Sequence, residues 1–219
     1  MQITLLCSSP EHPVNAWLES WRAHHQGRHS ITLCRTKDEL PGGDVLFLVS
    51  CSQIIDAATR AHYLHTLVLH ASDLPYGRGW SPHIWSLLEG AASITVSLLE
   101  AEDGVDTGAI WAKRTFPVPA HALHDEIHRL LFDTELELMD EGLTLIGAGA
   151  KPQPQPATKT PTYYRKRTPA DSEVDPTNSL CELFPIIRLM DPQRYPAFFR
   201  LHGHTYSIEL KKVPIHDDD

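Results

Sequence analysis

Apolar residues in the first 120 positions form short continuous runs that alternate with segments of helical spacing. The runs are rich in aliphatic and β-branched side chains, which is typical of strands buried on both faces. The pattern predicts strands at residues 3–7, 30–34, 45–49, 67–69, 93–99 and 109–116. It predicts helices between them at residues 14–24, 54–63 and 82–88, the last with Pro82 as its first residue.

The second half of the chain begins with a single long amphipathic segment. Ile127, Leu130, Leu131, Thr134, Leu138 and Met139 share one helical stripe, and the helix is predicted to end near residues 147–149. A proline-rich stretch at residues 151–156 follows and should be extended. Beyond it we expect a helix at residues 180–190, interrupted by Pro185, and a hairpin of two strands at residues 198–201 and 205–210 around Gly203.

The alternation of strands and helices predicts an α/β fold, with a Rossmann-like, mostly parallel sheet and a small C-terminal α+β appendage that contains the hairpin. We divide the chain into a catalytic domain at residues 1–150, a proline-rich linker at 151–162, a small C-terminal region at 163–212 and an acidic, solvated tail at 213–219. In open parallel sheets, ligands bind beyond the carboxyl ends of the strands. His70 lies at one of those ends, so the search for a site begins there.

Composition narrows the class of protein. The 219 residues carry a formal net charge of −9, and such a surface repels a polyphosphate backbone, so bulk nucleic-acid binding is not expected. No apolar run is long enough to span a membrane, and the N-terminus lacks the basic start of a signal peptide. Four cysteines without a paired spacing are typical of thiols in a reducing compartment. We therefore expect a cytoplasmic protein, and the pattern does not indicate its oligomeric state.

Two loops carry candidate chemistry. Residues 70–79 read His-Ala-Ser-Asp-Leu-Pro-Tyr-Gly-Arg-Gly after a buried strand, and residues 106–108 read Asp-Thr-Gly between two further strands. Alone, a histidine at a strand end more often makes a structural hydrogen bond, and an acidic loop is more often only a turn. Together, in this order and about 35 residues apart, the two loops resemble those of the formyltransferase family that uses 10-formyltetrahydrofolate.

The resemblance implies a role for each of the two central residues. His70 would donate a hydrogen bond to the oxyanion that forms when an amine attacks the formyl carbonyl, and Asp106 would orient His70 or a water that takes the amine proton. The resemblance implies no metal. The family usually has an asparagine two residues before the histidine as a further donor, where this chain has Val68. Ser50, Ser52 and Gln53, after the neighbouring predicted strand, are candidates to replace it.

The resemblance also implies where the formyl donor lies. The pterin of 10-formyltetrahydrofolate would contact mainly the backbone of the loop before Asp106. The candidate donor contacts in that loop are Glu102, Asp103, Gly104 and Val105. Leu74 and Pro75 would shape the cleft from the other loop.

The amine that receives the formyl group is indicated by the second half of the first loop. Its sequence through Gly79, Trp80, Ser81 and Pro82 most resembles nucleotide-sugar N-formyltransferases of the pseudaminic acid pathway, which act on a UDP-linked 4-amino-4,6-dideoxy sugar. A nucleotide diphosphate needs cations and aromatic surfaces. The candidate substrate contacts are Arg78, Trp80, Tyr163, Arg165, Lys166 and Arg167.

Other interpretations remain open at this point. The acceptor could be another amine, such as a carrier-bound amino acid, or the chain could be a catalytically weak protein that binds folate or a nucleotide sugar, as Val68 suggests. Residues 163–167 could equally be a solvated basic turn. His121, His124 and His128 are interpreted as residues of a helix surface, without a metal-binding pattern.

Overall fold

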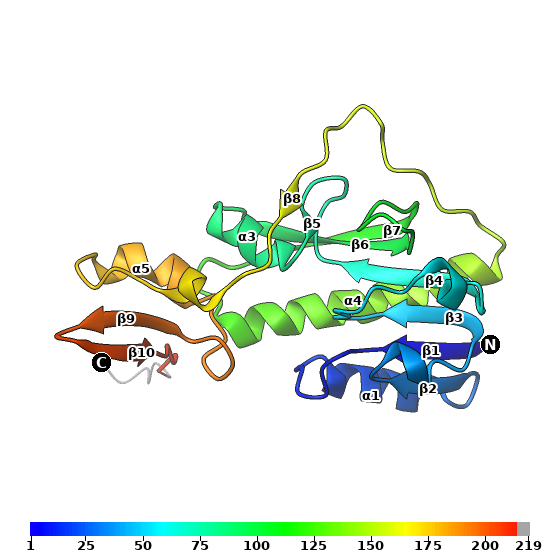
Figure 1. Cartoon of the computed structure of the whole chain (residues 1–219), viewed down its shortest axis with the longest axis horizontal. Coiled ribbons are helices and arrows are strands. Elements are labelled where there is room, and N and C mark those ends of the chain that lie inside the picture. Colours follow the sequence, from blue (N-terminus) through cyan, green and yellow to red (C-terminus); the bar gives the residue numbers. More distant parts are fainter. Residues whose placement is uncertain (214–219) are drawn as a thin grey trace, which may run out of the picture.

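The computed structural model describes residues 1–213, and the predicted acidic tail falls almost entirely on residues 214–219, outside the described residues. Figure 1 shows an elongated molecule, with the large sheet and its helices at one end and a two-stranded hairpin at the other. A long helix, α4, runs along the sheet and extends toward the hairpin end. Within residues 1–213, no helix is long and apolar enough to cross a membrane.

The central sheet has six strands in the order β2-β1-β3-β4-β6-β7. Strands β2, β1, β3 and β4 are parallel, and β6 and β7 join them in antiparallel pairs. The strands are β1 (Gln2–Leu6), β2 (Ser30–Cys34), β3 (Gly43–Leu48), β4 (Tyr63–His70), β6 (Ser93–Glu100) and β7 (Ile110–Pro117). The predicted α/β fold with a mostly parallel sheet is therefore confirmed.

The continuous apolar runs arise because both faces of the sheet are covered. Along β3, Val45 and Phe47 point into the larger apolar cluster, whereas Leu46 and Leu48 point into a smaller one on the opposite face. Alternate side chains of a strand point to opposite faces of the sheet. Here both sets are apolar, because neither face is exposed to water. The smaller cluster is closed by the segments around η1 (Lys37–Glu39) and α2 (Ala57–Arg60).

Helices α1 (Asn15–His25) and α4 (His124–Gly147) contact each other and line the larger cluster. Two tryptophans of α1 fix this contact, because the indole N–H groups of Trp17 and Trp21 donate to Asp133 (2.7 Å) and Asp140 (2.8 Å) of α4. Helix α4 buries the predicted stripe, with Leu130 only partly buried, and it also buries Glu135. Helix α3 (Pro82–Leu88) contacts β6, and its Ile84 and Leu87 belong to the same larger cluster.

Two predicted helices differ in the structure. The helix expected at 54–63 is only α2, Ala57–Arg60, and Tyr63 already belongs to β4. The phenol of Tyr63 accepts from the Gly42 N–H and donates to the Thr4 hydroxyl, so tertiary contacts extend the strand. Helix α5 (Leu180–Ile187) continues through Pro185. A proline there removes only the bond to the carbonyl of Cys181, an exposed residue of the first turn, which water can satisfy.

The C-terminal region ends in the predicted hairpin, formed by β9 (Ala197–Leu201) and β10 (His204–Ile208). Its turn residues His202 and Gly203 both have positive φ. Several residues of this region belong to the same large apolar cluster as the sheet: Val174, Leu183, Ile187, Leu189, Met190 and Ala197. The region therefore packs onto the core of the catalytic fold. Its remaining elements are β5 (Arg78–Gly79), which pairs with β8 (Tyr163–Tyr164), and η2 (Pro169–Ser172).

The interpretation of His124 and His128 as surface residues was wrong. Both residues are partly buried, and their rings contact each other in a tilted arrangement, with centroids 4.0 Å apart, while the edge of one ring of the His83–His128 pair meets the face of the other. Burial lowers the pKa of His128 and of His83, and lowers the pKa of His124 to about 4. These rings are therefore neutral near pH 7. His121 is exposed, as expected.

Candidate active site

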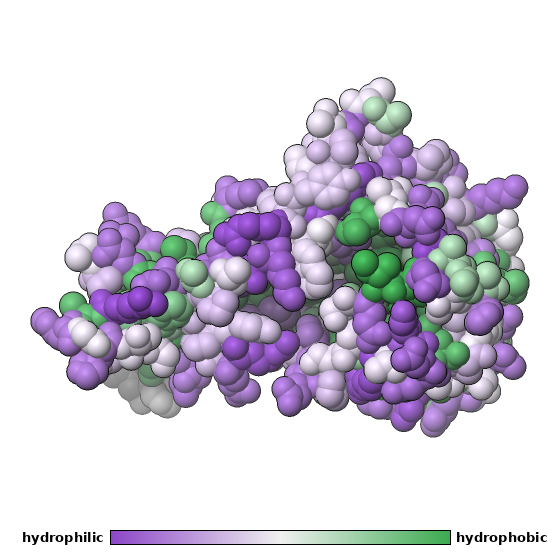
Figure 2. Space-filling view, in the orientation of Figure 1, coloured by the Kyte–Doolittle hydropathy of each residue, from purple (hydrophilic) through white to green (hydrophobic). Residues whose placement is uncertain are grey.

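The two candidate loops meet at one place. His70 is the last residue of β4. Asp106 lies in the loop after β6, and its carboxylate is next to the His70 imidazole. Figure 2 shows that the surface is hollowed in the middle of this face of the body, with apolar side chains gathered beside the hollow. The structure thus brings together the two residues that the sequence singled out from positions far apart in the chain.

His70 is buried, with 7% of its surface exposed. Its Nε2 lies 2.8 Å from the carbonyl oxygen of Gly77, in its own loop. Because a carbonyl only accepts, Nε2 donates the proton of this hydrogen bond, so Nδ1 is the ring nitrogen left for contacts within the site. Nδ1 faces Asp106 Oδ1 at 3.5 Å.

The Asp106 carboxylate contacts both ends of residues 70–79, here called the histidine loop. Its Oδ1 faces His70, and its Oδ2 accepts a hydrogen bond of 2.8 Å from the Gly79 N–H. The residue has φ +55°, in the left-handed region that Asp tolerates better than most side chains. The side chain is only 10% exposed. A carboxylate and an imidazole held in this way can take up and donate a proton in turn, which suits acid–base chemistry on a bound amine.

The histidine loop is held rigidly by groups on the neighbouring strands. The Ser97 hydroxyl of β6 donates to the Ser72 carbonyl at 2.7 Å, and the Lys113 ammonium of β7 donates to the Leu74 carbonyl at 2.6 Å. On the outer side, the Thr162 hydroxyl accepts from the Gly77 N–H at 2.8 Å. Gly77 therefore holds both His70, through its carbonyl, and Thr162, through its N–H.

The residues expected to contact the formyl donor fall into two groups. Leu74 and Pro75 are buried, so they support the loop from within. Glu102, Asp103 and Gly104 are exposed, as is Val105, at 56%. The Asp103 carboxylate is paired with Arg60 of α2 at 2.5 Å, which anchors this loop beside Asp106. An exposed valine next to Asp106, within an exposed polar loop, fits a flat, partly polar ring.

The group expected to replace the asparagine is not Gln53. Its side-chain amide donates to the Arg35 carbonyl (3.0 Å) and accepts from the Lys37 N–H (2.9 Å), which holds it toward β2. Val68 itself packs against the smaller apolar cluster. Ser50 is exposed at the end of β3 with φ +49°, and its hydroxyl remains a candidate.

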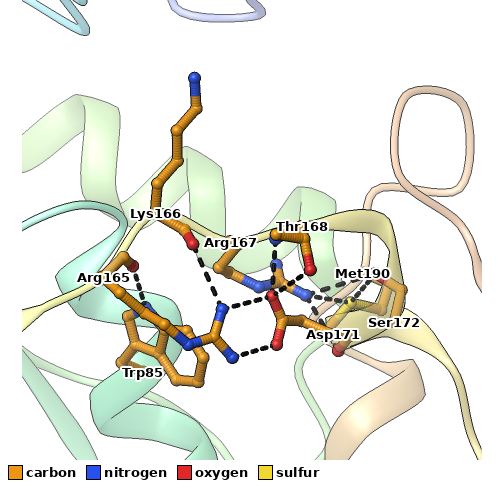
Figure 3. Close-up of polar contacts among 8 residues, drawn as sticks. All are labelled: Trp85, Arg165, Lys166, Arg167, Thr168, Asp171, Ser172 and Met190. Carbon is orange, nitrogen blue, oxygen red and sulfur yellow. Dashed lines mark hydrogen bonds and ion pairs between the residues drawn. The ribbon is translucent and has the colours of Figure 1, made fainter.

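The basic residues around position 166 have different roles in the structure (Figure 3). Arg165 lies over the Trp85 ring at 4.8 Å and pairs with Asp171, holding the pKa of that carboxyl well below its usual range. Arg167 donates to the Ser172 hydroxyl at 3.3 Å, and burial lowers its pKa. Both guanidinium groups are thus engaged in holding the chain around η2. In Figure 3 the ammonium of Lys166 extends away from this cluster.

The remaining candidate substrate contacts lie at the surface beside the histidine loop. The Lys166 ammonium lies 4.9 Å from the centre of the Trp80 ring, which is 42% exposed. The Arg78 guanidinium donates to the Tyr163 phenol at 3.0 Å, and Tyr163 is 61% exposed. Each pair combines a cation with an accessible aromatic ring, the combination that a phosphate and a planar base can use.

Two residues at the site were missed from the sequence, Gln155 and Thr162. Both lie in or beside the proline-rich stretch that was interpreted as a linker, and both bond the candidate loops. The stretch has no periodicity, so no pattern indicates which of its side chains point inward. Across residues 1–213, no group of three or more His, Cys, Asp or Glu is arranged to hold a metal ion.

Residues 101–109 between β6 and β7 are here called the aspartate loop. Near its end, the backbone of Gly108 lies very close to the backbone of Glu100. A Cβ added there would lie 1.8 Å from the Glu100 carbonyl oxygen. Gly108→Ala must therefore displace the loop, and we expect it to lower the free energy of unfolding by about 2 kcal/mol. Urea unfolding measures this, with Gly147→Ala as the control, because nothing lies within 4 Å of a Cβ at that position. Equal midpoints for the two variants would show that the close approach imposes no constraint.

Comparison with known sequences gives a consistent result. The family model described as Formyl transferase matches residues 11–143. A methionyl-tRNA formyltransferase of Nitrosomonas eutropha is 31% identical over 167 residues, which cover 75% of this chain and 52% of that protein. The chain thus spans about half the length of the curated relatives it matches.

Solved structures show the same fold. Methionyl-tRNA formyltransferase from Clostridium thermocellum superposes with a TM-score of 0.80 at 22% identity, covering 98% of this chain and 94% of that one. HypX from Aquifex aeolicus, in complex with tetrahydrofolic acid, gives 0.79 at 24% identity over 94% of this chain and 36% of its own. A sugar N-formyltransferase from Shewanella sp. FDAARGOS_354 gives 0.72 at 14% identity and covers 99% of each chain.

Proposed function

Because the family model matches more than half of its residues, this chain belongs to the formyl transferase family, and from that premise we propose that it transfers a formyl group from 10-formyltetrahydrofolate to the amine of a nucleotide-linked amino sugar. The observation that carries the proposal is the His70–Asp106 pair. Its two side chains face each other at 3.5 Å, beside the exposed loop residue Val105.

The pair accounts for the proton movements of the reaction. The amine nitrogen attacks the formyl carbon, and the carbonyl π electrons move to its oxygen. Asp106 accepts the proton that the amine nitrogen loses, directly or through a water. A proton on Nδ1 of His70 forms a hydrogen bond to the oxyanion and stays on the ring. Collapse of the intermediate expels N10 of tetrahydrofolate, which takes the proton, so both side chains return to their starting state.

The donor would be held by the loop before the aspartate. We assign its contacts to Glu102, Asp103, Gly104 and Val105, with the buried Leu74 and Pro75 supporting the opposite wall. This assignment is supported by the exposure of Val105 and by the Arg60–Asp103 pair, which holds the loop in place. The folate supplies the activated one-carbon unit.

A nucleotide sugar is favoured as the acceptor by the surface beside the histidine loop. The Arg78–Tyr163 and Lys166–Trp80 pairs offer two cations and two accessible rings next to the reacting pair. The net charge of −9 disfavours a tRNA acceptor. We propose a UDP-linked 4-amino-4,6-dideoxy sugar of the pseudaminic acid type, as the loop sequence suggests.

To test this, the purified protein is mixed with 10-formyltetrahydrofolate and with one of three acceptors: a UDP-4-amino sugar, methionyl-tRNA or a carrier-bound amino acid. We expect tetrahydrofolate release and a formylated sugar in the mass spectrum with the first acceptor. Formylation of only methionyl-tRNA or the carrier-bound amino acid would overturn the sugar assignment. Binding of donor and sugar without any turnover would identify the chain as a binding protein.

A further inference from the structure

Residues 151–164, here called the strap, join α4 to β8 and cross both candidate loops. In Figure 1 the strap leaves the end of α4, passes above β7 and descends to β8. Gln153 exchanges two backbone hydrogen bonds with Ile110, just after the aspartate loop (2.7 and 2.8 Å). Near its other end, Thr162 accepts from the Arg78 N–H at 2.9 Å and Tyr164 accepts from the Trp80 N–H at 3.1 Å. The strap therefore touches the loop of Asp106 and the loop of His70.

Between these two attachments, one side chain bonds both loops. The Gln155 amide nitrogen donates to the Asp106 carbonyl at 2.8 Å and to the Gly108 carbonyl at 3.0 Å. Its amide oxygen accepts from the Arg78 guanidinium at 2.6 Å. All three polar positions of the amide group are used, and the residue is partly buried.

The aspartate loop needs such support. Asp106 has φ +55° and must keep Oδ1 toward His70 and Oδ2 on the Gly79 N–H. Its own carbonyl and that of Gly108 both accept from the Gln155 amide nitrogen, so a single NH₂ group sets the orientation of the peptide groups that follow Asp106 and Gly108. A carboxamide suits this position, because it can donate two hydrogen bonds and accept another without a charge.

We propose that Gln155 is a positioning residue for formyl transfer, which holds the backbone of Asp106 so that its carboxylate faces His70. The inference rests on the proposed function, because the rate it affects is that of the formyl transfer. The competing explanation is that Gln155 serves the strap or the substrate side only, through Arg78.

Two substitutions separate these explanations. Gln155→Ala removes all three hydrogen bonds. Gln155→Glu removes both donated bonds to the aspartate loop but keeps an acceptor for Arg78. A misplacement of about 1 Å can cost up to about a hundredfold in rate. We expect both variants to lower kcat by about 10- to 100-fold, with the KM for the nucleotide sugar changed by less than about threefold. Recovery of wild-type kcat in Gln155→Glu would overturn the proposal in favour of a role through Arg78.

The matched control is Gln153→Ala. Gln153 lies two residues earlier in the strap and uses its backbone for the contact with Ile110, while its side-chain amide makes only a 3.4 Å bond to the Lys151 carbonyl. We expect its kcat to stay within about twofold of wild type. A loss equal to that of Gln155→Ala would mean that strap integrity, and not the Gln155 amide, sets the rate.

A double variant tests whether Gln155 acts through Asp106. In Asp106→Asn the carboxylate is already absent, so a displacement of residue 106 has little further effect on the rate. Adding Gln155→Ala to Asp106→Asn should therefore lower kcat by less than about a further threefold. Fully multiplicative losses would show that Gln155 acts elsewhere.

Hydrogen exchange gives a readout that does not depend on turnover. Peptides covering residues 102–109 should exchange faster in Gln155→Ala than in wild type or in Gln153→Ala. Unchanged exchange would overturn the positioning role even in an active enzyme. Conversely, a wild-type protein with no activity on any acceptor, but with this exchange pattern, would overturn the proposed function and leave the structural link intact.

Discussion

Asp106→Asn is expected to lower kcat by about a thousandfold, within the range of about 10²–10⁴ that acid–base groups contribute. The amide keeps the shape of the carboxylate, and its oxygen can still accept from the Gly79 N–H. What changes is the side toward His70, where an NH₂ group that cannot take a proton replaces Oδ1. The variant should therefore fold normally, bind its substrates and fail in the chemical step.

Steady-state release of tetrahydrofolate measures this, with the unfolding midpoint recorded in parallel. The control is Asp125→Asn, an exposed aspartate in the first turn of α4, remote in sequence from both loops. We expect wild-type kcat for the control. If Asp106→Asn kept more than a tenth of the wild-type rate, Asp106 would not be the group that takes the amine proton.

The largest expected effect on stability comes from Glu135. Its side chain lies in the core at 5% exposure, and within the described part of the chain its Oε2 has no hydrogen-bond partner. Burial raises its pKa to about 8. Below the pKa of an unfolded glutamate, about 4.3, both states hold the proton. As the pH rises toward 8, the unfolded state loses its proton first, so the stability of the fold decreases.

Glu135→Gln cannot titrate, so it should lose none of this stability between pH 4.5 and pH 8. At pH 8 we expect it to exceed wild type by on the order of 4 kcal/mol, and at pH 4.5 the two should agree within about 1 kcal/mol. Urea unfolding at a series of pH values measures the difference, in which the buried histidines cancel because both proteins carry them. Glu137→Gln, on the exposed side of the same helix, is the control. Parallel pH profiles for wild type and Glu135→Gln would show that the buried carboxyl does not titrate in this range.

The elements that the sequence predicted well are those whose period comes from local chain geometry. The run at β3 is apolar at every position because its alternate side chains enter two separate clusters, and α4 follows a stripe of helical spacing. The predictions were weaker where tertiary contacts determine the bounds or the direction of an element. Tyr63 joins β4 because its phenol bonds Gly42 and Thr4, from other parts of the sheet. Whether β6 runs parallel or antiparallel to β4 cannot be predicted from a run buried on both faces, because the apolar pattern is the same.

The candidate site divides in a similar way. His70 and Asp106 were predicted because each lies in a loop that follows a strand, with a sequence that marks the loop. Arg165 and Arg167 show the opposite case, since a basic run carries no information about which of its charges are paired. In the structure Asp171 and Ser172 bond these two guanidinium groups, whereas Lys166 extends away from them.

By itself, the sequence determined the α/β class, the long helix, the C-terminal hairpin and the two loops that carry His70 and Asp106, because strand and helix periods and turn residues act over short distances along the chain. Only the tertiary structure decided that these two side chains face each other, that a linker glutamine bonds the loops of both, and that Oε2 of Glu135 is enclosed without a hydrogen-bond partner among residues 1–213. Each of these depends on groups distant in sequence meeting in space, and on burial, which no local pattern of residues specifies.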